Sequence, residues 1–439
     1  MLVLWIAIGR GSIALYFAHS MTFELRASDN RATGLAAEQA IEGAARYVRY
    51  VLSNFATNGA VPNNTQFASA AVPVGDAHFW IIGRDPSGTP SADPCFGLVD
   101  EASKLNLNRA GTNALSYLPN MTFDFASAIV DWRSTNGSGA YALDYAQPGY
   151  AEKESPFETV DELRLVYGAT MTLLAGEDVN RNGVLDGNET DGNGNGTVDP
   201  GLFDYVTVYS RQPNYHSDGS SLTNVNLAPV AQLQALFQGA GAGNASGLAT
   251  SIYNYTHPRN GPPNTFRSIL SFCLFCRNQG LSSDGFARIY YDVTTSTNLY
   301  LTGLVNVNTA GVPVMIALFM GLGVDQSTAS GAAQSLVAYR QQNPGNLNSV
   351  AWIVDALGNN NAVVQALGTA NRDYITTQSF QFTADVAAVG PFGRGYRRVK
   401  FIFDISEGTP KIIYRQDLSR LGWALGEKIR TTWVAKETQ

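Results

Sequence analysis

The chain begins with the stretch MLVLWIAIGRGSIALYFA, residues 1–18, and continues without a proline to Asn54. This opening run is apolar apart from Arg10, and its length is close to the roughly 20 residues of a membrane-spanning helix. From Thr22 to Asn54, apolar residues recur mostly at spacings of three and four, while charged residues take the other faces. The stretch predicts one long helix with one end in a membrane. A cleaved signal peptide followed by a soluble helix is the alternative, and both interpretations take the protein out of the cytoplasm.

The whole chain is long, acidic and poor in charged residues. Its 439 residues suggest two or three domains, and a hydrophobic content of 45% excludes a wholly disordered polymer. Charged residues make up 15% of the chain, against about 25% in a typical soluble domain. The net charge is −7, which argues against a nucleic-acid partner because phosphate binding needs clustered Lys and Arg.

Turn signals and β-branched runs divide the remainder of the chain. Strand-like runs occur at residues 78–82, 95–99 and 205–209, and residues 379–414 predict a small antiparallel sheet. We therefore expect an α+β fold that combines a long N-terminal helix, helical segments in the middle of the chain and an antiparallel sheet. The expected parts are an N-terminal helix at 1–58, strands at 59–104, a helical domain at 105–204, a strand with a variable insertion at 205–304, a second helical subdomain at 305–370 and C-terminal strands at 371–439.

Short motifs recur in the same order in two helical parts. The sequence LNLNRA at 105–110 is echoed by VNVNTA at 305–310, with a weaker copy at 225–228. Two later motifs are also repeated, which predicts two related helical subdomains whose Asn side chains cap helix starts. Gly321-Leu-Gly323 between helical runs is typical of a helix-hairpin-helix, a motif that can present N–H groups to DNA phosphates. Residues 306–339 contain no Lys or Arg, so a packing module is favoured over a nucleic-acid reader.

The tract at 178–189 fits the calcium-loop template at every defining position. Gly183 allows the sharp turn at position six. The predicted ligands at positions one, three, five, seven, nine and twelve are Asp178, Asn180, Asn182, Val184, Asp186 and Glu189. Because a hard cation takes six to eight oxygens, this spacing can wrap them around a single Ca²⁺.

A second tract starts the same template thirteen residues later. Its predicted ligands are Asp191, Asn193, Asn195, Thr197 and Asp199. Position twelve is Leu202, so the closing bidentate carboxylate is missing. The tract could form a weaker calcium site or lend ligands to the first loop.

Cysteine and catalytic signals are weak. Cys273 and Cys276 have C-x-x-C spacing, which leaves a local disulfide, two buried thiols, or metal or redox chemistry as alternatives. The four histidines lie in no H-E-x-x-H or triad-like context, and the chain has no G-x-S-x-G or P-loop motif. We therefore expect no enzymatic activity; an enzyme that uses the uninformative segment 222–298 is the alternative class.

Several of these motifs occur in an order that resembles the general secretion pathway protein K family, the large minor pseudopilins of bacterial type II secretion systems. The motifs that carry the resemblance are Asp100–Asn108, Ile129–Arg133, Pro156–Leu163, Thr207–Ser210 and Val305–Ala310. The resemblance implies an N-terminal helix packed on a pilin-like sheet, with a helical domain inserted among the strands. It also implies calcium in the inserted domain, in agreement with the loop at 178–189.

The resemblance further implies a single-pass protein of the bacterial inner membrane with a periplasmic soluble domain. Its expected partners are the other minor pseudopilins of a tip complex and the major pseudopilin, with no nucleic acid and no small-molecule substrate. A helix-hairpin-helix DNA-binding protein of a competence or type IV pilus-like system is the alternative.

Two features predict that the subunit caps a filament. In pilin-like filaments, an acidic residue near the mature N-terminus pairs with the terminal amine of a neighbour. No Asp or Glu precedes Glu24 here, and Trp5 stands at position five if Met1 is near the mature start. The bulk of the inserted domain, from Asn106 to about Asp204, should also prevent neighbours from packing on every side.

Overall fold

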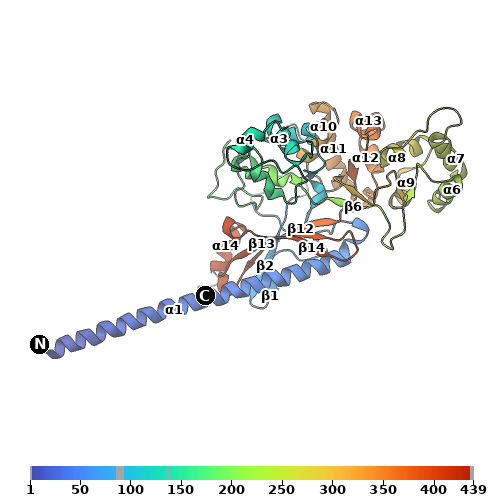
Figure 1. Cartoon of the computed structure of the whole chain (residues 1–439). Helices are drawn as coiled ribbons and strands as arrows, with labels where there is room; N and C mark the ends of the chain where they lie inside the picture. Colours follow the sequence, from blue (N-terminus) through green and yellow to red (C-terminus); the bar gives the residue numbers. More distant parts are fainter. Residues whose placement is uncertain (1, 86–92, 137–138, 436–439) are drawn as a thin grey trace.

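The computed structural model of the protein describes residues 2–85, 93–136 and 139–435. Its longest element is helix α1, Leu2–Phe55, whose N-terminal part projects from the body of the molecule (Figure 1). One face of the helix is buried from Thr33 onward, and the helix ends at Phe55, shortly before Asn58, which has a φ of 56° in the left-handed region that Asn tolerates. In the described ranges, no helix combines the length and the apolar character that crossing a membrane requires.

The C-terminal half of α1 packs on an antiparallel sheet with the strand order β1-β2-β12-β13-β14, and β3 pairs with one end of β12. The strands are β1 Val72–Val74, β2 Ala77–Ile82, β3 Val99–Asp100, β12 Gln381–Val389, β13 Arg397–Asp404 and β14 Lys411–Asp417. The helix approaches the sheet closely because its buried face is made mostly of small residues, namely Ala37, Ala40, Ile41, Ala44, Ala45, Val48, Val51 and Leu52. Trp80, Ala424 and Leu425 cover the other face, where the chain enters the last helix, α14 Gly426–Ala435.

All of the chain between β3 and β12 forms a separate helical body beside the sheet (Figure 1). The predicted α+β fold, with a long helix on an antiparallel sheet and a large helical insertion, is therefore confirmed. The insertion contains three copies of one unit. Each copy has a two-residue strand, a helical hairpin, a further helical segment and a second short strand that pairs in parallel with the first.

The elements of the three repeats are as follows. Repeat 1 holds β4 Leu105–Asn106, α2 Thr112–Ser116, α3 Phe123–Arg133, α4 Ala142–Ala146, η3 Val160–Leu165, α5 Met171–Ala175, η4 Leu202–Asp204 and β5 Val206–Thr207. Repeat 2 holds β7 Thr223–Asn224, α6 Val230–Gly239, α7 Ala245–Thr256, α8 Ile269–Asn278, α9 Ser283–Ile289, η5 Tyr290–Asp292 and β8 Val293–Thr294. Repeat 3 holds β10 Val305–Asn306, α10 Val312–Gly321, α11 Gln326–Gln342, η6 Pro344–Asn346, α12 Ala351–Leu357, α13 Ala362–Thr369 and β11 Ile375–Thr376.

The Asn-x-Asn motif makes the same hydrogen bonds in every repeat. The side-chain oxygen of the first Asn accepts from the backbone N–H of the second, at 2.9, 3.0 and 2.9 Å in repeats 1 to 3. The side-chain nitrogen of the second Asn donates to a carbonyl about 40 to 50 residues later, at 2.9, 2.9 and 3.0 Å. These Asn side chains therefore fix the turn into the hairpin and fasten it to the later helical segment, which is broader than the helix capping that the sequence predicted.

The segment 205–304, expected to hold a strand and a variable insertion, thus contains a complete third copy. Strands β6 Arg211–Pro213 and β9 Tyr300–Thr302 pair antiparallel at its entry and exit, so repeat 2 stands on a two-stranded stalk. Repeat 3 lies in the middle, because α10 packs on α2 of repeat 1, while α12 and α13 pack on α9 and α8 of repeat 2. One continuous apolar core runs through all three repeats.

Two adjacent acids, Asp100 and Glu101, join the sheet to the repeats. The Asp100 carboxylate accepts hydrogen bonds from Asn306 and Thr309 of repeat 3 and from Ser379 before β12. Burial raises the pKa of Asp100 to about 6, against the lowering effect of these donors. Glu101 accepts from Thr207 of repeat 1 and, at 2.6 Å, from Thr383 of β12. Burial acts to raise the pKa of Glu101, but nearby Lys104 and Lys400 help to bring it below its ordinary value.

Candidate metal centre

The predicted first loop lies between α5 and η4 and is wrapped around its own acidic side chains. The Asp178 carboxylate, at position one, accepts from the backbone N–H groups of Asn182 and Gly183, both at 2.8 Å. The Glu189 carboxylate, at position twelve, accepts from the N–H groups of Asn180 and Asp186 at 3.1 and 3.0 Å. Gly183 has a φ of 84°, the left-handed turn that the template requires at position six. The structure thus brings the predicted first-loop carboxylates onto one short turn.

The second loop repeats this pattern at the equivalent positions. Asp191 accepts from the N–H groups of Gly194 and Gly196 at 2.7 and 2.8 Å. The side-chain oxygen of Asn195 accepts from the backbone N–H and the hydroxyl of Thr197, both at 2.7 Å. In contrast to Asp178, the Asp191 carboxylate lies in an exposed turn, and its hydrogen bonds from backbone N–H groups, that of Gly196 first, lower its pKa.

The second loop, which has no acid at position twelve, is contacted instead by Glu177, which precedes the first loop. Glu177 accepts from the N–H of Gly192 at 2.6 Å and from the N–H of Asp199 at 3.0 Å. In the first loop, the Glu189 carboxylate accepts from the N–H groups at positions three and nine. In the second loop, the Glu177 carboxylate accepts from the N–H groups at positions two and nine, so it lies in nearly the same place. The backbone places it there, because the Glu177 N–H also donates to the Asp199 carbonyl at 3.0 Å. The loop template does not include Glu177, because it places the closing acid downstream of the loop.

In both loops, two Asn amides face the carboxylate at position nine. The side-chain nitrogens of Asn180 and Asn182 donate to Asp186 at 2.5 and 2.8 Å, and Asn193 donates to Asp199 at 2.5 Å. Within the described residues, no three His, Cys, Asp or Glu side chains are grouped closely enough to hold a metal ion by themselves. A cation at either loop would thus need amide and carbonyl oxygens as well, which is the mixed donor set that calcium takes in such loops.

The first loop is anchored to the sheet by two arginines. Arg398 of β13 is fully buried, pairs with Asp385 through two hydrogen bonds at 2.9 and 2.6 Å, and donates to the carbonyls of Asn180 and Arg181. Arg84, which follows β2, donates to the Arg181 carbonyl of the loop at 3.2 Å and pairs with Asp204 of η4 through two hydrogen bonds of 2.9 Å. Two cations on the sheet side of the molecule therefore hold the backbone of the first loop.

The surroundings of Asp178 in the first loop disfavour the charged form of its carboxyl group when no ion is bound. Burial raises the pKa of Asp178 to about 6, Arg84 at 3.7 Å acts to lower it, and Asp204 raises it further. A buried carboxylate with a raised pKa gains from a neighbouring cation, since the cation favours the charged form.

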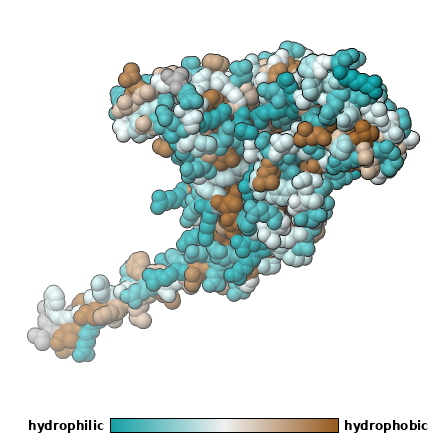
Figure 2. Space-filling view, turned by 45° about the vertical axis from the view of Figure 1, so that its right-hand side comes forward, coloured by the Kyte–Doolittle hydropathy of each residue, from teal (hydrophilic) through white to brown (hydrophobic). Residues whose placement is uncertain are grey.

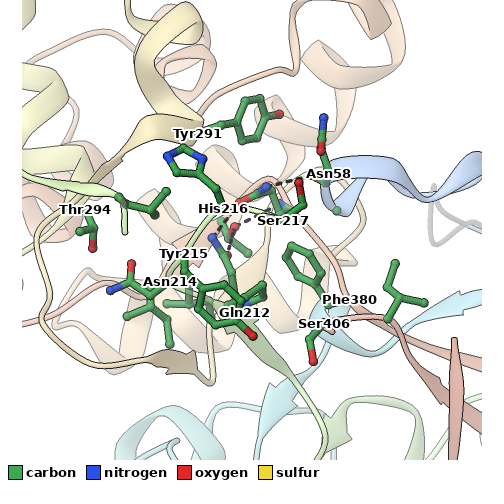
Figure 3. Close-up of a pocket in the computed structure, with 18 of the residues that line it drawn as sticks. Asn58, Gln212, Asn214, Tyr215, His216, Ser217, Tyr291, Thr294, Phe380 and Ser406 are labelled. Carbon is green, nitrogen blue, oxygen red and sulfur yellow. Dashed lines mark hydrogen bonds between the residues drawn. The ribbon is translucent and has the colours of Figure 1, made fainter. Parts of the chain in front are cut away.

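A second feature is a cavity of about 810 Å³ where the sheet meets repeats 2 and 3. Figure 3 shows His216, Tyr215 and Asn214 from the segment after β6 on its wall, with Asn58 and Phe380 from the sheet side. The His216 Nδ1 lies 3.9 Å from Asp292 Oδ1, across the strand ends of repeat 2. The cavity wall mixes aliphatic side chains, amides, hydroxyls, aromatic rings and four acids. The cavity could not be predicted from the sequence, because segments far apart in the chain form it.

The cysteine pair and the Gly-x-Gly turn that the sequence singled out both lie in tightly packed parts of the structure. Cys273 and Cys276 are free, fully buried thiols on α8, and burial raises the pKa of Cys273 to about 12. The turn at Gly321 is packed on α2, because a Cβ on Gly321 would lie 2.6 Å from the Cβ of Ala114. Of the interpretations that the sequence left open, the structure thus favours buried thiols and a packing hairpin.

The N-terminal part of α1 exposes apolar side chains that no other described part of the chain covers. Figure 2 shows brown, apolar atoms among paler and teal ones along the projecting helix. The exposed apolar side chains include Val3, Trp5, Ile6, Ile8, Ile13, Leu15, Tyr16, Phe17, Met21, Phe23 and Leu25, each at least half exposed. An apolar surface of this length marks an interaction site.

A long helix on an antiparallel sheet, with the helical insertion beside it, defines an α+β protein with a pilin-like architecture. No family model matches the chain, and no curated protein matches it. Among solved structures, it is similar to a chain in the crystal structure of the GspK-GspI-GspJ complex from the type 2 secretion system of enterotoxigenic Escherichia coli. The identity is 10%, the TM-score is 0.45, and the match covers 90% of this chain and 99% of that one.

Proposed function

We propose that the protein is a minor pseudopilin that stands at the tip of a type II secretion pseudopilus and supports protein export across the outer membrane. The observation that carries the proposal is the projecting part of α1, whose apolar residues face outward on all sides between Val3 and Leu25. A surface of this kind is suited to a bundle of similar helices from other subunits. The order of motifs from Asp100 to Ala310 supports the same assignment.

The location of the repeats supports a tip position. In Figure 1 they form a broad head at the end of the molecule opposite the N-terminus of α1, and they extend well beyond the sheet. If α1 joins the filament core, a subunit stacked above would meet this head. We therefore place other minor pseudopilins and the major pseudopilin below it, with the sheet and repeats in the periplasm of the cell envelope.

Engineered cysteines on α1 test the proposal in cells that assemble the filament. Ile13→Cys and Phe17→Cys should form disulfides with cysteines on the first helix of other minor pseudopilins, and no disulfides between two copies of this chain. Ile413→Cys, on the exposed side of β14, is the matched control outside the helix. Disulfides between copies at Ile13→Cys and Phe17→Cys would contradict a tip position.

We also propose that the two loops bind calcium. In the first loop, Asp178, Asn180, Asn182, Val184, Asp186 and Glu189 would hold the ion; in the second, Asp191, Asn193, Asn195, Thr197, Asp199 and Glu177 would hold it. Bound Ca²⁺ supplies positive charge that joins the carboxylates and orders the tract. If the Asn side-chain amides rotate by 180°, their oxygens replace their nitrogens beside Asp186 and Asp199 and can bind the ion. Both loops share one hydrogen-bond pattern, which supports the same chemistry in each.

Calorimetric titration with CaCl₂ distinguishes the two loops. The wild-type protein should bind two ions, and the double variant Asp178→Ala with Glu189→Ala should lose the tighter one. Glu177→Gln should weaken only the second, while Glu158→Gln, an exposed acid of repeat 1, should change neither. Unchanged binding in Glu177→Gln would show that Glu177 is not a ligand, and unchanged binding in the double variant would exclude the first site.

A further inference from the structure

Three arginines gather where repeat 1 meets repeat 3. Arg109 follows the Asn-x-Asn motif of repeat 1, Arg133 ends α3, and Arg372 lies just before β11. Arg372 donates to the backbone carbonyl of Arg109 at 3.2 Å, and its guanidinium lies 4.3 Å from the centre of the Tyr374 ring. In residues 2–85, 93–136 and 139–435, none of the three guanidinium groups forms an ion pair with an acid. Such a group of cations is unexpected in a chain with a net charge of −7.

The hydrogen bonds of Arg133 indicate that the cluster lacks a negatively charged partner. Its Nη2 donates to the Ala110 carbonyl at 2.6 Å, whereas its Nη1 is buried without an acceptor among the described residues. The equivalent Arg340 of repeat 3 uses its Nη1 to donate to the carbonyls of Val307 and Ala310, at 3.1 and 2.8 Å. Burial, followed by the charges of Arg109 and Arg372, lowers the pKa of Arg133 to about 10. The same position is thus satisfied in repeat 3 and unsatisfied in repeat 1.

A cavity of about 300 Å³ lies directly beside the cluster. Arg109 and Arg372 form part of its wall, together with Tyr374 and the chain from Gly111 to Ala114 at the start of α2. Leu318 and Leu322 of repeat 3 close the other side. The cavity therefore offers two guanidinium groups and an aromatic ring to a ligand of a few atoms.

We propose that this cavity binds a small oxyanion, a carboxylate or a phosphate group, between Arg109 and Arg372. The planar fork of a guanidinium matches both anions, and two such groups can hold one anion from different sides. An anion there also relieves the repulsion among the three arginines, so it joins repeat 1 to repeat 3. This site is separate from the calcium loops and does not depend on a role in secretion.

Titration of the full-length protein in mild detergent tests the site. Sodium phosphate and sodium citrate are titrated separately by calorimetry, with NaCl at equal ionic strength as the control for general screening. Arg109→Gln and Arg372→Gln should each weaken binding by about tenfold or more, the effect expected for loss of a charged hydrogen bond. Arg259→Gln, an exposed arginine of repeat 2, should bind as the wild type does.

Melting temperatures distinguish an anion-binding site from a purely structural role of the arginines. Without added anion, Arg109→Gln should melt no lower than the wild type, because it removes a like charge, yet it should lose the stabilisation by phosphate or citrate. Binding of only one of the two anions identifies the oxyanion. Equal binding in wild type and both variants, or equal stabilisation by NaCl, would overturn the proposal.

Discussion

Replacing Arg398 by Met should destabilise the protein by about 3–5 kcal/mol, the cost of breaking a buried ion pair from one side. The Arg398 side chain is fully buried and its partner Asp385 is 11% exposed, so water cannot replace the lost hydrogen bonds. The carbonyls of Asn180 and Arg181 also lose their donor, which releases the first loop from the sheet. Urea denaturation of the full-length protein in detergent, followed by circular dichroism, measures the change.

Two further variants make this test specific. Arg415, on the neighbouring strand β14, forms an exposed ion pair with Glu42 of α1, and Arg415→Met should cost at most about 1 kcal/mol. The double variant Arg398→Met with Asp385→Leu should recover much of the lost stability, because no buried charge is left unpaired. A loss below about 1 kcal/mol for Arg398→Met alone would refute the anchoring role of this residue.

Three other results are expected. Removal of calcium with EDTA should lower the melting temperature and make residues 177–201 sensitive to protease, since the ion binds only the folded loops; an unchanged melting temperature and cleavage pattern would argue against bound calcium. Cys273 and Cys276 should react with iodoacetamide only after denaturation, because burial raises the pKa of both thiols, and a mass two hydrogens lower in the unreduced protein would reveal a disulfide instead. The pKa of Asp100 is about 6 in the folded state and about 4 in the unfolded state, so its stabilising contribution of about 3 kcal/mol is present below pH 4 and is lost as the pH rises through 6. Comparison of urea midpoints at pH 4 and pH 7 checks this, and the difference should shrink in Asp100→Asn.

Local patterns predicted the parts of the molecule that short segments determine. The long helix, the C-terminal sheet and the Asn-x-Asn turns all rest on spacing within a few residues, and each lies where the sequence placed it. The tract from Asp178 to Glu189 is likewise one continuous turn, and backbone N–H groups of the tract donate to both of these carboxylates. Calcium binding by this loop stays a prediction.

The features that the sequence did not show depend on contacts between distant segments. Repeat 2 keeps the Asn224 and Asn226 pair, but its helices differ enough that only a short echo was visible. The Glu177 carboxylate accepts a hydrogen bond from a loop that starts fourteen residues later, so Glu177 lies outside the residues that the template covers. Arg109 and Arg372 are brought together only because repeat 3 packs against repeat 1. Each of these features needs the fold before it can be recognised.

Labelling of isolated filaments tests whether this subunit stands at their tip. An antibody against repeat 2, which stands out on the stalk of β6 and β9, can be coupled to gold and applied to isolated pseudopili. We expect gold at one end of each filament and none along its length. Gold distributed along the filaments would show that the subunit repeats within them, and it would contradict the proposed tip position.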